Sequence, residues 1–125
     1  LFPYTTLFRS IGNGDITSLE QARTEVTRSG CDGVMIGRGI FHNPWIFNES
    51  VTQEHITPQA KAKVMLDHAQ LFEQHFAHIK RYDVLKRFFK IYINGFDGAA
   101  NIRDELYHTT SVAEATSVLH KFNLV

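Results

Sequence analysis

The chain has 125 residues, 43% of them apolar, and its 13 Lys and Arg balance 13 Asp and Glu. This composition fits a modest globular protein and excludes a disordered tail or a membrane protein, because no run approaches the roughly 20 consecutive apolar residues that a membrane helix needs. No secretory signal is visible, so we expect a cytoplasmic location. The single cysteine, Cys31, excludes an internal disulfide and a multi-thiolate metal site.

The first ten residues, LFPYTTLFRS, look foreign to the rest of the chain. They are the translation of the codons CTC TTT CCC TAC ACG ACG CTC TTC CGA TCT, and this DNA sequence resembles a common short-read sequencing adapter. We therefore expect residues 1–10 to be an adapter translation and the remainder to be the tail of a longer protein. The alternative is a genuine apolar N-terminal strand.

Residues 11–50 predict two βα units, the first of which begins at Ile11. Ile11 ends a strand and residues 12–15 form a loop. Thr17 with Glu20 then makes a capping box for a helix that Gly30 ends after Ser29.

The second unit repeats this order. The strand Val34–Ile36 leads into a loop over residues 37–39 and then a helix from Ile40 to Phe47. Short apolar strands separated by a helix favour a parallel arrangement, and two such units cannot make a complete fold.

Both glycine-rich loops follow the carboxyl ends of predicted parallel strands, where βα barrels bind ligands and often phosphate groups. The glycines permit close approach and unusual φ, so that successive N–H groups can point at a phosphate, and a helix N-terminus adds positive charge. Arg38 can add a cationic fork, and Asn13 and Asp15 can bind ribityl or phosphate-proximal groups, unless Asp15 caps the following helix. The glycines concerned are Gly12, Gly14, Gly37 and Gly39.

For each loop alone, an ordinary tight turn is the simpler interpretation, and the pairing of the two loops is what favours phosphate binding. A Rossmann site is disfavoured, because the second strand ends in Ile36-Gly37-Arg38 without a ribose-binding carboxylate.

Residues 57–125 predict a bundle of four short helices, over 58–80, 82–94, 97–107 and 111–122. Gly95 is the expected C-cap of the second helix, Asp97 opens the third, and Ser111 with Glu114 forms a capping box for the last. The apolar stripe of the first helix comprises Val64, Leu71, Phe72, Phe76 and Ile79, and that of the second comprises Leu85, Phe88, Phe89 and Tyr92.

A basic ridge, defined as Lys86, Arg87 and Lys90, lies on the second of these helices away from its apolar face. Such a ridge can contact RNA phosphates, which adds affinity and salt dependence but little sequence information. The alternative is a solvated helix face on which Asp83 pairs with Arg87.

Several other residues invite functional interpretations that their spacing does not favour. We expect Cys31 to be a small packed thiol, and Trp45 and Phe47 to pack in a core or seam rather than stack on bases. His68 and His75 fall beside Val64 and Leu71, so packing is favoured over a metal site.

Four stretches together resemble the C-terminal part of tRNA-dihydrouridine synthases. They are Ile11-Gly12-Asn13-Gly14-Asp15-Ile16, Cys31-Asp32-Gly33-Val34-Met35-Ile36-Gly37-Arg38-Gly39, Asn43-Pro44-Trp45-Ile46-Phe47, and Tyr92-Ile93-Asn94-Gly95-Phe96-Asp97-Gly98-Ala99-Ala100 with Arg103. The resemblance covers nearly everything after residue 10, and it is specific as a set rather than in any single stretch.

The resemblance implies the last two βα units of a TIM-type FMN barrel in residues 11–50 and a helical tRNA-recognition domain in residues 57–125. The family reduces the C5–C6 double bond of uridine in tRNA with FMN and NADPH. By the same resemblance Asn13, Gly14, Asp15, Gly37 and Arg38 bind FMN, with Gly39 a neighbouring candidate.

The resemblance also implies that the family's catalytic cysteine lies in an earlier barrel loop. Cys31 is not its equivalent, so we expect no catalytic residue here and no activity from this chain alone. We expect the RNA-binding residues to be Lys86, Arg87, Lys90 and Arg103, although Arg103 can instead tie neighbouring helices together.

Two other functions stay open. One is a non-catalytic helical RNA-binding or interaction module. The other, an FMN-phosphate barrel with a different substrate, is disfavoured by the helical tail with its Asn94-Gly95-Phe96-Asp97-Gly98 segment.

Overall fold

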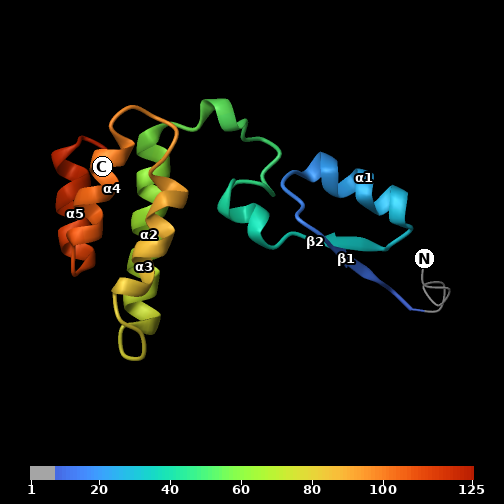
Figure 1. The fold of residues 1–125 in the computed structure, drawn as a ribbon, viewed down its shortest axis with the longest axis horizontal. Coiled ribbons are helices and arrows are strands. Elements are labelled where there is room, and N and C mark those ends of the chain that lie inside the picture. The colour runs from blue at the N-terminus through green and yellow to red at the C-terminus, as the bar shows by residue number, and fades with distance from the viewer. Residues whose placement is uncertain (1–7) are drawn as a thin grey trace. The chain divides into compact units, whose positions relative to one another are not determined.

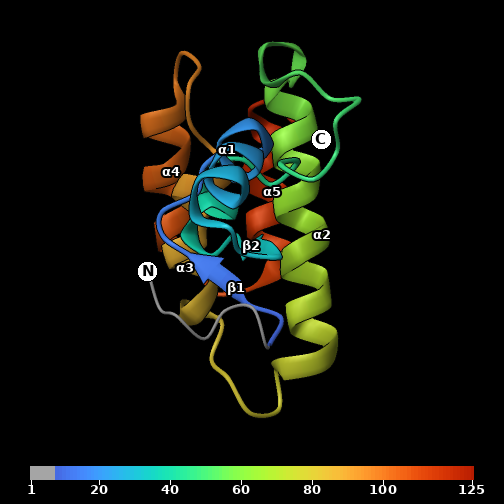
Figure 2. The same ribbon diagram turned by 90° about the vertical axis from the view of Figure 1, so that its right-hand side faces the viewer.

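The computed structural model describes residues 8–125, apart from the side chain of residue 53, and they divide after His55 into two compact units. Figures 1 and 2 trace them from blue to red along the chain. Of the ten residues expected to be foreign, residues 1–7 lie outside the described part. Ser10 lies inside it, donating its N–H to Asp32 Oδ2 at 2.7 Å and accepting from the Asp32 N–H at 3.0 Å.

The first unit is a parallel two-stranded sheet with one crossover helix. Strand β1 (Ile11–Asn13) pairs with β2 (Gly33–Met35), with Ile11 opposite Gly33 and Asn13 opposite Met35. Helix α1 (Leu19–Ser29) connects them and lies beside the sheet in Figure 1. The predicted strand, helix, strand order with parallel strands is therefore confirmed, because the helix returns the chain to the same end of the sheet.

Three predicted boundaries in this unit are wrong, and one is that of β2, which covers Gly33–Met35 rather than Val34–Ile36. Strand β1 begins at Ile11 and includes Asn13, rather than ending at Ile11. The N-cap of α1 is Ser18, whose Oγ accepts from the Gln21 N–H at 3.1 Å, while Thr17 donates its N–H to Gln21 Oε1. The capping residue thus lies one position later than expected. The C-cap at Gly30 is confirmed, with φ 72.

The predicted helix from Ile40 to Phe47 does not form. A short 3-10 helix, η1 (Arg38–Phe41), is followed by turns. Pro44 has no N–H to donate to a preceding turn, and Asn43 Oδ1 instead accepts the Trp45 N–H at 3.0 Å. A second 3-10 turn, η2 (Gln53–His55), ends the unit.

The second unit contains four α-helices, as predicted. They are α2 (Pro58–Phe76), α3 (Asp83–Tyr92), α4 (Ala99–His108) and α5 (Val112–Lys121). Helix α2 packs on α3 and α5, and α4 packs on the same two helices, which closes a small bundle (Figures 1 and 2).

The helix ends follow the capping signals with small shifts. Ser111 Oγ accepts the Glu114 N–H at 3.2 Å and so starts α5 as expected. Helix α4 starts at Ala99, after Gly98 at φ 81, rather than at Asp97. Helix α3 ends at Tyr92 and its C-cap is Ile93, so the prediction that Gly95 caps it is wrong; Gly95, at φ 76, lies two residues beyond the cap.

The large apolar core lies in the second unit, and α2 contributes a different face from the predicted stripe. Leu71, Phe76 and Ile79 are exposed, whereas alanines and their neighbours are buried. On α3 the expected Leu85 and Phe89 are both 1% exposed. The buried residues of α2 are Ala62, Met65, Leu66 and Ala69.

Within residues 8–125, no helix is both long and apolar enough to cross a membrane. In the same range, no three His, Cys, Asp or Glu side chains gather closely enough to hold a metal ion.

Candidate functional site

Two contacts join the glycine-rich loops that follow β1 and β2. Arg38 Nη2 donates to Asp15 Oδ1 at 2.5 Å, across 23 residues of sequence. Gly39 lies against Ile16, because a Cβ at residue 39 would be 2.0 Å from the Ile16 carbonyl oxygen. The parallel sheet therefore places the two loops side by side at the carboxyl ends of its strands, where a phosphate site was expected.

The loop surface offers both a cation and open backbone. The Asp15 and Arg38 side chains are each 80% exposed, so a dissolved anion can reach the guanidinium. A Cβ at Gly14 would meet no atom within 4 Å, so its backbone is also accessible. Arg38 provides the planar donor fork that suits a phosphate.

The backbone of these loops differs from the expectation in two ways. None of the four loop glycines has a positive φ; the residue that adopts it is Asp15, at φ 42. Asp15 does not cap α1, since Ser18 does. The element that begins at Arg38 is the four-residue 3-10 helix η1, which is too short to supply the expected helix dipole. The glycines matter here for close approach, as at Gly39, rather than for φ.

A hollow of about 330 Å³ lies beside β1 and α1. Gly12, Asn13, Gly14, Gln21 and Cys31 contribute to its lining, whereas Arg38 does not. Cys31 is half-buried, and its Sγ lies 3.5 Å from the position of a Cβ on Gly12, as expected of a packed thiol.

The two aromatic residues after Pro44 differ in burial. Trp45 is half-buried beside the buried Ile46, which fits the packing role expected of it. Phe47 is 63% exposed, so it does not pack in a core, and the alternative that it packs in a seam stays a prediction.

The three cations of the basic ridge on α3 differ in their exposure to solvent. Lys86 Nζ lies 2.9 Å from Asp83 Oδ1 and 5.9 Å from the centre of the Tyr82 ring, and its side chain is only 20% exposed. Asp83 thus pairs with Lys86, and also with Arg81, rather than with Arg87 as the alternative supposed. The Lys86 and Arg81 contacts lower the pKa of Asp83. Arg87 and Lys90 are the exposed cations of the ridge.

Arg103, the fourth expected RNA ligand, points into the bundle. Its Nη1 donates to the Ile93 carbonyl at 2.7 Å, so it joins α4 to the end of α3. Lys61 joins α2 to the residues that follow α3, because its Nζ donates to the Asn94 carbonyl at 3.0 Å. Sequence reasoning missed Lys61, because nothing local signals a contact with a residue 33 positions away.

His68 packs between α2 and α3. Its Nδ1 lies 3.0 Å from the Tyr92 hydroxyl, and its ring meets Phe88 edge-on at 5.3 Å. Burial lowers the pKa of His68 and raises that of Tyr92. His75, by contrast, is exposed. The packing role expected of the histidines therefore holds for His68 only.

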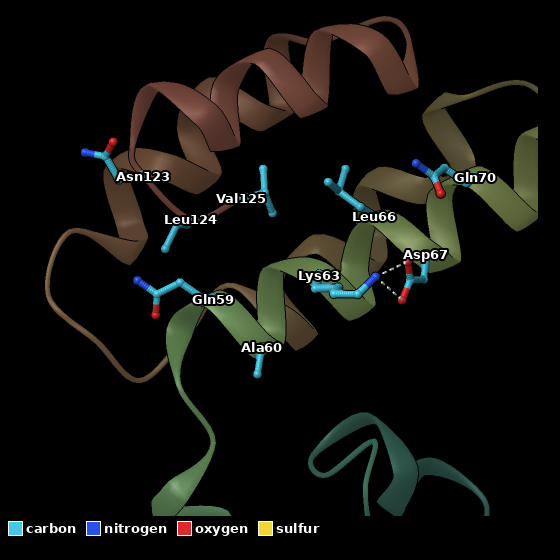
Figure 3. A pocket seen from close by; sticks show the side chains of 9 residues that line it. All are labelled: Gln59, Ala60, Lys63, Leu66, Asp67, Gln70, Asn123, Leu124 and Val125. Carbon is cyan, nitrogen blue, oxygen red and sulfur yellow. Dashed lines mark hydrogen bonds and ion pairs between the residues drawn. The ribbon is translucent and has the colours of Figure 1, made fainter.

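A second hollow, of about 540 Å³, lies between α2 and the C-terminal residues (Figure 3). Lys63 and Asp67 form an ion pair at 3.1 Å along one side of it. None of the residues expected to bind FMN or RNA lines this hollow, whose other residues are Gln59, Ala60, Leu66, Gln70, Asn123, Leu124 and Val125.

Comparison with known proteins places these features in context. The family profile described as "Dihydrouridine synthase (Dus)" matches residues 8–124. The chain is 41% identical over 111 residues to a "Probable tRNA-dihydrouridine synthase" of Staphylococcus aureus (strain Mu50), covering 88% of this chain and 33% of that protein. It is 38% identical over 111 residues to the "Probable tRNA-dihydrouridine synthase 2" of Bacillus subtilis (strain 168), covering 88% of this chain and 34% of that protein. The chain thus spans about a third of the length of these curated relatives.

Proposed function

The chain belongs to the dihydrouridine synthase (Dus) family, and we propose that it forms the C-terminal part of a flavin-dependent tRNA-dihydrouridine synthase. In this proposal β1, α1 and β2 belong to the last two βα units of an FMN barrel. Helices α2 to α5 form the tRNA-recognition domain. The whole enzyme reduces the C5–C6 double bond of uridine in tRNA, and NADPH supplies the electrons.

The observation that carries the proposal is the joining of the two loops through Asp15 and Arg38, in a chain that matches the family over residues 8–124. An exposed guanidinium next to open glycine backbone fits the phosphate end of FMN. Asn13, Gly14, Asp15, Gly37, Arg38 and Gly39 would hold that end of the cofactor.

When bound, FMN supplies the hydride chemistry. The residues of this chain bind and orient: Arg38 neutralises phosphate charge, and Gly39 lets the second loop approach Ile16 closely enough to complete the cradle. The residue that protonates the uracil ring belongs to an earlier part of the barrel, so we expect this chain alone to be inactive.

We propose that tRNA phosphates contact α3 through Arg87 and Lys90. Both are exposed, and the only acidic residue among positions 80–90 is Asp83, which pairs with Arg81 and Lys86. Lys86 contributes less, because its side chain is only 20% exposed.

Titration with FMN tests the phosphate site through amide chemical shifts of the labelled chain. We expect weak binding that shifts the amides of residues 13–15 and 37–39, because two loops cannot enclose the flavin ring. Arg38→Ala should abolish these shifts, whereas Arg23→Ala on α1, another exposed arginine, should leave them unchanged. Equal shifts in both variants would refute the site, and a yellow complex that survives gel filtration would refute the need for the rest of the barrel.

A second candidate is a stand-alone helical RNA-binding module. The observation that favours it is that the main cluster of buried apolar residues lies entirely within α2 to α5 and the C-terminal residues. FMN titration distinguishes the two, because such a module has no reason to respond to FMN at residues 13–15 and 37–39.

A further inference from the structure

Three side chains bind the carbonyl groups at the C-terminal end of α3. Asn94 Nδ2 donates to the carbonyls of Lys90 at 2.9 Å and Ile91 at 2.7 Å. Arg103 donates to the Ile93 carbonyl at 2.7 Å, and Lys61 donates to that of Asn94 at 3.0 Å. The last carbonyls of a helix have no partners inside it and carry partial negative charge, so two cations stabilise this end.

These contacts bring together three separate parts of the bundle. Lys61 comes from α2, Arg103 comes from α4, and Asn94 follows α3 itself. Both cations are half-buried. The chain turns at the residue after Asn94 with φ 76, a backbone conformation that favours glycine, and this position is Gly95.

The other end of α3 is also fixed. Thr109 Oγ1 donates to the Leu106 carbonyl at 2.6 Å, and it therefore accepts from the Tyr82 hydroxyl at 2.8 Å. Tyr82 immediately precedes α3, and Thr109 immediately follows α4. Helix α3 is thus tied to α4 at both ends, which fixes its direction and its rotation about its own axis.

The exposed cations of α3 lie close to the end held by Lys61 and Arg103. The Lys90 carbonyl is itself one of the bound groups, and Arg87 lies one turn earlier. Phosphate contacts depend on where these cations point, so a loosened helix end would misplace them.

We propose that Lys61 and Arg103 are positioning residues for tRNA binding, which act by fixing the end of α3 and make no phosphate contact themselves. This inference rests on the proposed function of α3. It assigns a role to Lys61 and replaces the direct RNA contact expected of Arg103.

A double-mutant cycle with an unmodified tRNA transcript tests this on the whole chain. Arg103→Met should weaken binding about fivefold, within the range of mutations that act at a distance. In a chain that already carries Arg87→Ala and Lys90→Ala, the same change should weaken binding less than about twofold, because the groups that Arg103 positions are gone. Amide exchange at residues 86–93 should also quicken, and exchange in α5 should not.

Lys61→Met provides a second variant on another helix and should repeat this pattern, even if Arg103→Met unfolds. Lys63→Met is the matched control, because Lys63 is an exposed lysine two residues away on the same helix. It should change neither affinity nor exchange.

Equal loss of affinity from Arg103→Met in both backgrounds, with a shallower salt dependence, would make Arg103 a phosphate ligand and overturn the proposal. An unchanged affinity in the parent chain would overturn it too. If the Arg87→Ala, Lys90→Ala chain binds tRNA normally, the α3 contact itself fails and the positioning role with it, which distinguishes that failure from the others.

Discussion

Gly39 is the residue with the least room in the candidate phosphate site. A Cβ there would lie 2.0 Å from the backbone oxygen of Ile16, and backbone cannot rotate away as a side chain can. At Gly14 the same atom would meet nothing within 4 Å. The lack of a side chain thus has a different consequence at each glycine. At Gly39 it permits the two loops to come into contact, and at Gly14 it leaves the backbone accessible.

Gly39→Ala should therefore destabilise the first unit by about 1–3 kcal/mol, the usual cost of overpacking. Urea unfolding followed by the fluorescence of Trp45, the chain's one tryptophan, measures this unit specifically. Gly14→Ala is the control and should change stability little. Equal effects of the two variants would show that the loops do not meet at Gly39.

His68 gives the stability of the bundle a pH dependence. Burial lowers its pKa in the folded state, so the unfolded chain, with a His pKa near 6.5, takes up the proton more readily. Stability should be full above about pH 6.5 and should decline as the pH falls below it.

Urea unfolding at pH 7.5 and 5.5 should show a smaller decline in His68→Gln than in the parent chain. His75→Gln, at an exposed position on the same helix, should keep the parental decline. Identical pH dependence in all three proteins would exclude His68 as the source.

Capping signals predict where several helices begin and end, whereas tertiary packing decides which face of a helix is buried. Ser111 and Gly30 mark their helix ends correctly, because capping is a local interaction. The predicted stripe on α2 is wrong except at Phe72, which packs against the core, because the buried face consists of Ala62 and Ala69 together with Met65 and Leu66. Alanines let two helices approach closely, but they contribute little to the pattern of large apolar residues from which a buried face is predicted.

In the candidate site, too, local signals predict the loops, whereas tertiary placement decides their contacts. Glycine loops after successive strands indicate where a ligand would bind, and the parallel sheet does bring them together. That Asp15 contacts Arg38, or that Lys61 reaches Asn94, depends on tertiary placement across 23 and 33 residues. Local signals cannot specify such contacts.

The exposed cations of α3 predict a measurable salt dependence. Arg87→Ala with Lys90→Ala should weaken tRNA binding and reduce the slope of log affinity against log salt by about 1–2, since each lost phosphate contact contributes about 0.7–0.9. Binding measured across a salt series gives the slope. Lys121→Ala, which removes an exposed lysine from α5, should leave it unchanged, and an unchanged slope in the α3 variant would assign the ridge to solvation alone.

At the scale of the whole molecule, the two units differ in their apolar cores. The second unit buries a cluster from four helices, with Leu106, Ala115 and Leu119 fully buried. The first has a two-stranded sheet on which Ile11 is 66% and Met35 47% exposed. A two-stranded sheet with one covering helix is marginal by itself, because it buries little apolar surface.

In the whole chain, residues 8–55 should therefore unfold at a lower urea concentration than residues 56–125. One urea titration followed by both Trp45 fluorescence and helical circular dichroism checks this, because Trp45 lies in the first unit and four of the five described α-helices lie in the second. Coincident transitions, or loss of the circular dichroism signal before that of Trp45, would contradict this distribution of stability.

We propose that this chain supplies the C-terminal flavin- and tRNA-binding part of a dihydrouridine synthase. The most direct test replaces the matching third of the Staphylococcus aureus relative with residues 11–125 and measures dihydrouridine in tRNA, with circular dichroism reporting that the hybrid is folded. We predict that the hybrid forms dihydrouridine and that Arg38→Ala within it loses flavin absorbance while it stays folded. A folded, flavin-loaded hybrid that binds tRNA but forms no dihydrouridine would show that this chain does not supply that part of the enzyme.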